Sequence, residues 1–313
     1  MAEAANPPTA AARTPVAALR TWAEMIKLSH SVFALPFAVL STFLAARSMT
    51  PPRLPGLADL ALIVVCMVGA RSAAMTFNRI VDAAIDARNP RTAIRALPRG
   101  LISPRAAWLF FLASCGVFLL GCAGFLYVDG NAWPIALAIP VLLVLCAYSW
   151  TKRFTRCSHL FLGAAIAMAP VAAWIAISPQ TLGAPAGFLM LAVACWIAGF
   201  DVIYACQDAD FDRSAGLFSI PSRVGVGRAL WIARGLHVVT TAALVATGLT
   251  AGLTAPYWIG VGCVVLLLVI ENAIVSPTDL SRVNLAFFTV NGVVGLVLGG
   301  LGVLDVCLQV LNP

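Results

Sequence analysis

Charged residues are scarce in this chain. Only 11% of its 313 residues are Asp, Glu, Lys or Arg, 61% are hydrophobic, and the mean hydropathy is +0.95. Soluble domains carry about 25% charged residues, so this composition predicts a polytopic membrane protein. The nine cysteines include no C-x-x-C pair and are scattered through apolar stretches. This scatter predicts a packing role for them.

No cleaved signal peptide is predicted. The first 26 residues are rich in Ala and Pro and lack an apolar core of about 7 to 15 residues. We expect residues 1–26 to form a flexible or interfacial N-terminal tail and residues 27–313 to form a single transmembrane domain. Residues 14–27 are expected to form a short interfacial helix with Leu19, Trp22 and Ile26 toward lipid. A disordered tail is the alternative.

Long uncharged stretches predict an all-α fold of about nine transmembrane helices, since each crossing needs about 20 apolar residues. Two of the stretches, 157–200 and 235–270, are each long enough for two helices. Pro-containing breaks at 178–180, 183–185 and 255–256 are expected to turn each of them into a hairpin. The other predicted spans are 28–46, 60–78, 106–128, 130–151 and 283–304.

The distribution of Lys and Arg predicts the orientation, because basic residues accumulate in short cytoplasmic loops. With Arg71 inside a span, only Arg47 and Arg53 of the 20 basic residues fall on one side of the predicted topology. We therefore expect a cytoplasmic N-terminus, an external C-terminus and a bacterial inner membrane location. The net charge of +7 follows this topology, which favours anionic lipid or a phosphorylated substrate over nucleic acid as a partner.

Two polar clusters with one spacing interrupt the apolar background, and they hold six of the 13 acidic residues, of which Asp210 lies off the stripes. Residues four apart lie on one face of a helix, so each cluster is expected to form a stripe of oxygen ligands at a cytoplasmic helix end. The alternative is an ordinary charged helix end, but carboxylates there oppose the helix dipole. The first stripe is Asn78, Asp82 and Asp86, and the second is Asp201, Tyr204, Asp208 and Asp212.

Oxygen ligands around one cavity favour Mg²⁺, which typically binds one or two carboxylates together with substrate phosphates. Two such stripes predict metal centres that face a diphosphate. Guanidinium and ammonium groups bind phosphate, and the flanking segments supply them. The candidates are Arg71, which lies well inside a span, and the loop residues Arg91, Lys152, Arg153 and Arg213.

These motifs resemble those of the UbiA-type intramembrane prenyltransferases. Asn78, Asp82 and Asp86 fill the family's N-x-x-x-D-x-x-x-D motif, the string DVIYACQDADFD fills its second Asp-rich motif, and Tyr148 and Lys152 fill its Y-x-x-x-K element. The strings NPRTAIRALPRG and GLFSIPSRVG are similar to those of 4-hydroxybenzoate polyprenyltransferases and their menaquinone-pathway relatives. One departure is visible, because Arg79 stands where many members have Asp.

The resemblance implies a nine-helix enzyme that uses Mg²⁺ to transfer a polyprenyl group from polyprenyl diphosphate to an aromatic acid. The acid would be 4-hydroxybenzoate or a dihydroxynaphthoate, in ubiquinone or menaquinone biosynthesis. The lipid bilayer is a further expected partner, and no obligate protein partner is expected. The implied metal ligands are Asn78, Asp82, Asp86, Asp201, Asp208 and Asp212; the catalytic residues are Asp82, Asp208 and Lys152; the substrate-binding residues are Arg71, Tyr148, Lys152, Arg153, Tyr204, Arg91, Arg213 and His30.

Two kinds of alternative stay open. Within the enzyme class, the acceptor could be homogentisate, a chlorin or haem. From another class, a divalent-cation or organic-anion transporter would also carry intramembrane acids, but it would favour ionisable groups near the bilayer midplane and inverted repeats. His30 could contact the acceptor or act only as an interfacial anchor, and His159 and His237 are expected to be structural.

Overall fold

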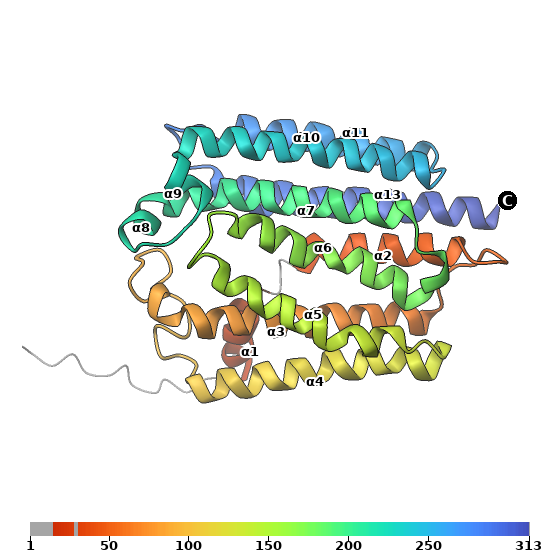
Figure 1. Ribbon diagram of the computed structural model, residues 1–313, viewed down its shortest axis with the longest axis horizontal. Helices are drawn as coiled ribbons and strands as arrows, with labels where there is room; N and C mark the ends of the chain where they lie inside the picture. Colours follow the sequence, from red (N-terminus) through yellow and green to blue (C-terminus); the bar gives the residue numbers. More distant parts are fainter. Residues whose placement is uncertain (1–14, 28–30, 313) are drawn as a thin grey trace, which may run out of the picture.

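The computed structural model describes residues 15–27 and 31–312, and the described chain folds into a bundle of helices (Figure 1). The helices are α1 (Pro15–Met25), α2 (Ser31–Arg47), α3 (Leu57–Asp86), α4 (Pro104–Asp129), α5 (Trp133–Thr151), α6 (Ser158–Ile177), α7 (Ala184–Ala205), α8 (Ala209–Ser214), α9 (Ile220–Val224), α10 (Val226–Thr250), α11 (Ala255–Ala273), α12 (Val283–Leu285) and α13 (Asn291–Leu311). The all-α prediction is confirmed.

The membrane-spanning helices agree closely with the predicted nine. Among the described residues, eight helical segments are long and apolar enough to cross a bilayer by length and composition, and α2 is a shorter apolar helix. Each predicted hairpin is present, as α6 with α7 and α10 with α11. Both second helices begin with a proline in their first turn, where its missing N–H would have no helical partner anyway.

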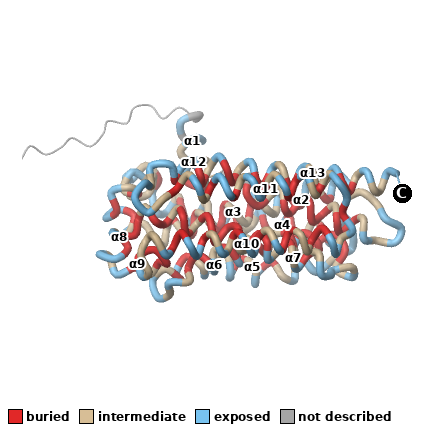
Figure 2. Tube along the Cα trace, turned by 90° about the horizontal axis from the view of Figure 1, so that it is seen from above, coloured by how far each residue is buried: buried red, intermediate tan, exposed pale blue. Residues whose placement is uncertain are grey.

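The helices stack in layers that run from α10 and α11, through α7 and α13, to α6 and α2, then α3 and α5, and finally α4 (Figure 1). Buried segments follow the interior of this stack (Figure 2). Many large apolar side chains on the outside are exposed, such as Leu120, Leu143 and Trp231. So many exposed large apolar side chains mark a lipid-facing bundle rather than a soluble one.

Small residues allow close approach of α3 and α4. A Cβ placed on Gly69 of α3 would lie 2.8 Å from the backbone nitrogen of Phe118 of α4. Cys66 and Cys122 meet at the same interface, with their sulfur atoms 3.8 Å apart. Small residues at helix contacts are typical of membrane bundles, where association depends on close van der Waals packing.

The expected N-terminal helix exists as α1, but its orientation differs from the prediction. Leu19 is exposed as expected, whereas Ile26 is buried. The ring centroids of Trp22 and Phe110 are 4.6 Å apart. Met25 and Ile26 join a small core with Ile102. The expectation that Trp22 and Ile26 face lipid is therefore wrong, because α4 and the loop before it cover that face of α1.

Candidate active site

A cavity of about 600 Å³ runs through the bundle between α2, α3, α5, α6 and α7. The last turns of α3, α5 and α7 line one end, which we call the polar end. Apolar residues such as Ile63, Phe125 and Ala176 line the opposite, apolar end. Pro134 and Ser149 both line the cavity from α5, and a helix rises about 22 Å between such positions. The cavity therefore suits a long apolar ligand with a charged head.

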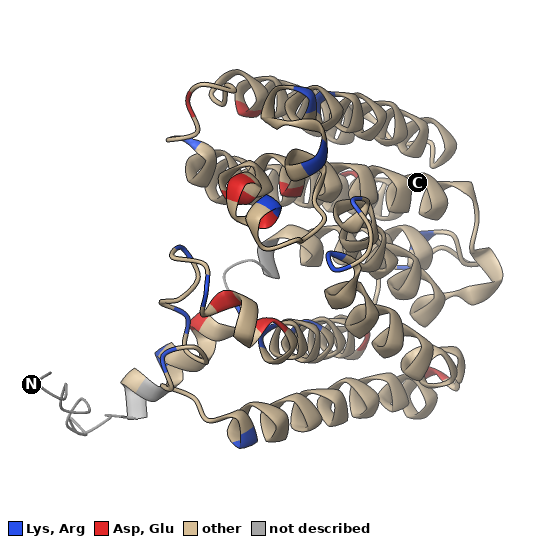
Figure 3. Ribbon diagram, turned by 60° about the vertical axis from the view of Figure 1, so that its left-hand side comes forward, with Lys and Arg blue, Asp and Glu red and all other residues tan. Residues whose placement is uncertain are grey.

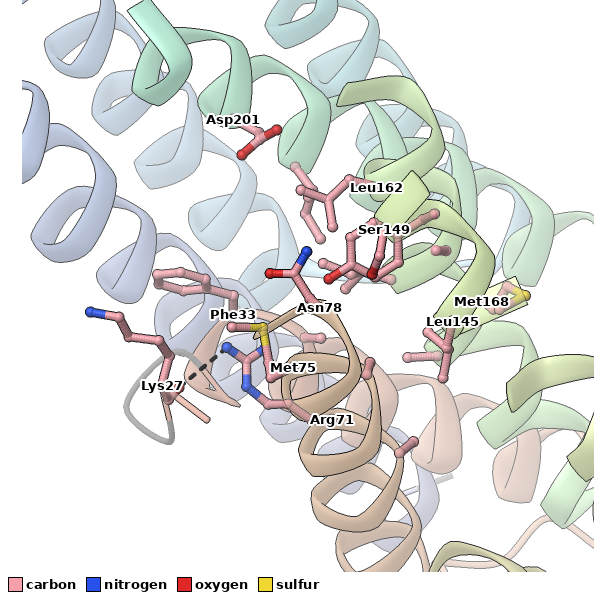
Figure 4. A pocket seen from close by; sticks show the side chains of 18 of the residues that line it. Lys27, Phe33, Arg71, Met75, Asn78, Leu145, Ser149, Leu162, Met168 and Asp201 are labelled. Atoms are coloured by element: carbon pink, nitrogen blue, oxygen red, sulfur yellow. Dashed lines mark hydrogen bonds between the residues drawn. The ribbon is translucent and has the colours of Figure 1, made fainter. Parts of the chain in front are cut away.

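The charged residues gather at the end of the bundle that carries the polar end of the cavity (Figure 3). Asn78, Ser149, Leu162 and Asp201, from four different helices, surround the same space in the close view (Figure 4). Among the described residues, the cavity wall contains seven Lys and Arg residues but four Asp residues. The wall thus has a net positive charge. Such a wall suits a ligand whose negative charge is larger than the positive charge of one bound metal ion.

The first acidic stripe lies on α3 as predicted, and all three of its residues line the cavity. The side-chain amide of Asn78 donates to Asp82 Oδ2 at 3.0 Å. Arg153 donates to Asp82 Oδ1 at 3.1 Å. Arg95 donates to both oxygens of Asp86, at 2.6 and 2.7 Å. Each carboxylate of this stripe thus already has a cationic partner.

The second stripe is interrupted, which corrects the expectation of one continuous helix. α7 ends at Ala205, a 3₁₀ turn spans Cys206–Asp208, and α8 begins at Ala209. A 3₁₀ turn has about 3.0 residues per turn instead of 3.6, so the four-residue spacing no longer keeps these side chains on one face. Asp201, Tyr204 and Asp208 line the cavity, whereas Asp212 does not.

Asp208 is held by the loop that follows α3. Arg91 donates from Nε to Asp208 Oδ1 at 2.8 Å and also pairs with Oδ2 through Nη2. Asn89 donates to Asp208 Oδ1 at 3.1 Å, and Arg91 Nη1 donates to the Tyr204 hydroxyl at 2.8 Å. Burial lowers the pKa of Arg91, but its bonds to Asp208 and Tyr204 outweigh this and raise the pKa above its usual value. Arg91 therefore stays charged beside the cavity.

Asp212 lies behind the cavity wall. Its carboxylate is completely buried, and Lys152 Nζ lies 2.8 Å from Oδ1. The approach is an ion pair without hydrogen-bond geometry, since within the described part of the chain neither oxygen of Asp212 has a hydrogen-bond donor. Lys152 itself lines the cavity. Asp212 is thus placed to hold Lys152 at the wall rather than to contact a ligand.

Three cations of the cavity wall have no acidic partner. Within residues 15–27 and 31–312, none of Lys27, Arg71 and Arg79 forms an ion pair with a carboxylate. Arg71 Nη2 donates to the Lys27 carbonyl at 3.2 Å, and no described residue accepts a hydrogen bond from its buried Nε. Burial and the nearby charge of Arg79 lower the pKa of Lys27. These three side chains form what we call the unpaired cation group.

The donor atoms of the polar end fit a divalent metal with a phosphorylated ligand. No three His, Cys, Asp or Glu side chains of the described residues converge as a protein-only metal site. Mg²⁺ does not need one, since it usually binds one or two carboxylates plus substrate phosphates. Asn78, Asp82, Asp201 and Asp208 present oxygen atoms to one cavity, and hard oxygen donors are those that Mg²⁺ prefers. These residues would hold the ion.

A family model described as the UbiA prenyltransferase family matches residues 34–293. The chain belongs to this family. The resemblance inferred from the two Asp-rich motifs is thereby confirmed. The matched range contains both motifs, all of α3, α5, α6 and α7, and most of α2, which together line the cavity.

Two proteins with similar sequences are 4-hydroxybenzoate prenyltransferases. The 4-hydroxybenzoate octaprenyltransferase of Vibrio cholerae is 35% identical over 211 residues, which cover 65% of this chain and 70% of that protein. The mitochondrial 4-hydroxybenzoate polyprenyltransferase of Aedes aegypti is 31% identical over 194 residues, 62% of this chain and 43% of that protein. This chain therefore spans less than half the length of the mosquito relative.

Solved UbiA structures share the fold. A UbiA homolog from Aeropyrum pernix in its apo form superposes with a TM-score of 0.77 at 30% identity, over 88% of this chain and 98% of that chain. A UbiA homolog from Archaeoglobus fulgidus bound to GPP and Mg²⁺ gives a TM-score of 0.64 at 20% identity, over 92% of this chain and 99% of that chain. At that identity, the second comparison shows the fold alone.

Some expected site residues of this UbiA chain lie elsewhere. Tyr148 lines the cavity, but Arg213 does not and instead pairs with exposed Asp210 at 3.1 Å. His30 lies outside the described residues. Residues that the sequence did not single out occupy the site: Asn89 and Arg95 hold carboxylates of the two stripes, and His159 contacts Asp201. The sequence signals for Asn89 and Arg95 were their position in the basic loop after α3 and their place in the string NPRTAIRALPRG.

Proposed function

We propose that the protein is a Mg²⁺-dependent polyprenyltransferase that transfers the prenyl chain of a polyprenyl diphosphate to a small aromatic acid. One observation carries the proposal: a single cavity, which extends about 22 Å along α5, joins two groups of carboxylates at its polar end to an apolar end. A diphosphate with a long hydrocarbon chain matches both ends of it. The net positive wall disfavours a divalent-cation transporter, which would need an excess of acids.

The reaction begins when the allylic C–O bond breaks and diphosphate leaves. Bound Mg²⁺ would supply positive charge to the leaving oxygens. Arg91, Arg153 and Lys152 lie at the polar end beside the carboxylates, where their charges stabilise the diphosphate as it departs. A ring carbon of the acceptor then attacks the allylic cation, a C–C bond forms, and loss of the ring proton restores aromaticity.

The unpaired cation group supports an acceptor that carries a carboxylate. Arg71 precedes Asn78 by two helical turns, about 10 Å deeper along α3, and its Nε has no hydrogen-bond partner among the described residues. A guanidinium can bind a carboxylate through two parallel hydrogen bonds. Lys27 and Arg79 add charge at the same wall. We therefore assign Arg71 to the acceptor acid, with 4-hydroxybenzoate and dihydroxynaphthoate as the leading candidates.

Aromatic side chains border the place where the two substrates would meet. Phe33, Phe200, Tyr204 and Phe287 all line the cavity. The ring centroids of Tyr204 and Phe287 are 4.3 Å apart, and those of Phe200 and Phe287 are 5.1 Å apart. Aromatic faces attract cations and exclude water, so this wall would protect the allylic cation from hydrolysis.

The test incubates purified protein with Mg²⁺, an octaprenyl diphosphate and a panel of aromatic acids, and identifies the products by mass spectrometry. We expect a prenylated acid together with free diphosphate. Asp82→Ala serves as the matched negative control because Asp82 contacts Asn78 and Arg153 at the polar end. Absence of any prenylated product across the panel would refute the proposal.

We further propose that the polar end faces the cytoplasm of a bacterial inner membrane. The concentration of Lys and Arg in the loops at this end supports that orientation. An alkaline phosphatase fused after α13 should be active if the C-terminus is external, since that reporter needs the oxidising periplasm for its disulfides. An inactive but stable fusion would reverse the orientation.

A further inference from the structure

Asp201 differs from the other acids of the two stripes in the kind of partner it has. Asp82, Asp86, Asp208 and Asp212 each pair with an Arg or a Lys. Asp201 Oδ2 instead lies 2.7 Å from Nδ1 of His159. The His159 side chain is 5% exposed, whereas that of Asp201 is 23% exposed toward the cavity that both residues line.

The hydrogen bonds of His159 define its protonation. Its second nitrogen, Nε2, accepts the backbone N–H of Ile220 at 3.3 Å. A nitrogen that accepts a hydrogen bond carries no proton, so the proton of the neutral ring lies on Nδ1 and is donated to Asp201. His159 is thereby a neutral donor to the carboxylate.

The contact that orients His159 is itself well anchored. Ile220 is the first residue of α9, directly after Ser219. Ser219 and Ser222 exchange side-chain and backbone hydrogen bonds, at 3.0 and 3.3 Å, in a capping box. Ser219 is completely buried. The start of α9 therefore fixes the Ile220 N–H, and through it the plane of the His159 ring.

A neutral donor orients a carboxylate without cancelling its charge. In the described part of the chain, no donor reaches the other oxygen of Asp201, Oδ1. Asp201 thus offers the cavity an oriented oxygen and a full negative charge, whereas Asp82, Asp86 and Asp208 must first loosen a bond to arginine. We propose that His159 is a positioning residue that holds Asp201 as the first carboxylate to bind the divalent metal.

The inference rests on the proposed metal-dependent function, and its test measures binding rather than turnover. Mn²⁺ binding to the full chain in detergent is followed by electron paramagnetic resonance, with inorganic diphosphate present. Loss of a hydrogen-bond partner behind a metal ligand typically costs about 10- to 100-fold in metal affinity. We therefore expect His159→Leu to raise the Kd for Mn²⁺ at least about tenfold.

Two further variants separate the roles of the donor and of its neutrality. His159→Gln keeps a neutral donor and should bind Mn²⁺ within about threefold of the wild type. His159→Lys keeps a donor but adds a positive charge, and should bind as weakly as His159→Leu. These two variants decide the question even if His159→Leu does not fold. Equal Mn²⁺ affinity for the Gln and Lys variants would overturn the claim about neutrality.

His237 supplies the matched control. It is as buried as His159 and is hydrogen bonded to Asn272, but it does not line the cavity. His237→Leu should leave Mn²⁺ affinity unchanged, whatever it does to the unfolding temperature. An equal loss in both Leu variants would identify a general packing effect and refute the positioning role.

The final comparison uses Asp201→Asn. If His159 acts through Asp201, adding His159→Leu to Asp201→Asn should weaken Mn²⁺ binding no further. Additive losses would refute the inference while leaving the metal-dependent function intact. If the wild type bound no Mn²⁺ with diphosphate, both this inference and the proposed metal use would fail. If the wild type binds Mn²⁺ and His159→Leu binds it equally well, the inference about His159 is refuted and the proposed metal use is not.

Discussion

Arg71 provides the most discriminating prediction about substrate recognition. Its guanidinium makes one hydrogen bond in the described structure, to the Lys27 carbonyl, and its buried Nε has no partner. We predict that Arg71→Met weakens use of the aromatic acid but not of the prenyl diphosphate. The reason is that the carboxylate of the acid would lose a bidentate, charge-assisted contact.

The expected magnitude follows from the bonds at stake. Each hydrogen bond to a charged group contributes about 1.5 to 3 kcal/mol, and two such bonds are not fully additive. A loss of about 3 kcal/mol corresponds to a decrease of roughly 10²-fold in kcat/KM for the acid. The free energy of unfolding should fall by less, about 1 kcal/mol, because Arg71 loses one hydrogen bond to a neutral acceptor. This loss is partly offset because the substitution also removes a buried charge whose Nε has no partner among the described residues.

The assay measures kcat/KM for each substrate separately and compares 4-hydroxybenzoate with its methyl ester. The wild type should prefer the acid strongly, and Arg71→Met should lose that preference. Arg71→Lys should fall between them, since an ammonium keeps the charge but not the planar fork. Arg47→Met is the control, because Arg47 binds Gln309 and the Ala251 carbonyl away from the cavity. A rise in KM for the prenyl diphosphate alone would refute the assignment.

The remaining predictions concern the metal, the chain and the fold. Asp208→Asn should lower kcat by about 10²- to 10³-fold without unfolding the protein. Chelation by EDTA should abolish turnover until Mg²⁺ is restored. Near-normal rates in either experiment would contradict the assignment of the metal site. Ala176→Phe at the apolar end should shift preference from octaprenyl to farnesyl diphosphate by roughly tenfold, from an overpacking cost of about 1 to 3 kcal/mol, as measured by competition between the two. Gly69→Ala should destabilise the α3–α4 contact by a similar amount, since its Cβ would lie 2.8 Å from the Phe118 nitrogen; Gly116→Ala, with nothing within 4 Å, is the control in thermal unfolding.

The membrane helices were predictable because hydropathy and helix breakers act locally. The span expected at 60–78 was too short, since α3 continues to Asp86. The prediction ended the span just before Arg79, although Asp82 and Asp86 face a polar cavity instead of lipid. The stripe itself was predicted correctly, because an uninterrupted α-helix preserves four-residue spacing.

The remainder of the site depends on contacts that the linear sequence does not reveal. The 3₁₀ turn before Asp208 is stabilised by Asn89 and Arg91, more than 110 positions earlier in the chain. His159 meets Asp201 across 42 positions. Local spacing carries no signal for such partners. From the sequence alone, His159 was therefore expected to be structural and Asp212 to be a metal ligand.

The ion pairs that cross the polar end make ligand binding an exchange of partners. Asp208, Asp86 and Asp82 are already neutralised by Arg91, Arg95 and Arg153. A metal ion that arrived alone could contact Asp201, but it would have to displace a guanidinium to reach Asp82, Asp86 or Asp208. A diphosphate that arrived alone would draw the guanidinium groups away and leave these carboxylates bare. When both arrive, the carboxylates turn to the metal and the guanidinium groups turn to the phosphates, so no charge is left uncompensated. Metal and diphosphate should therefore bind with strong reciprocal cooperativity, each raising the affinity for the other by the same factor.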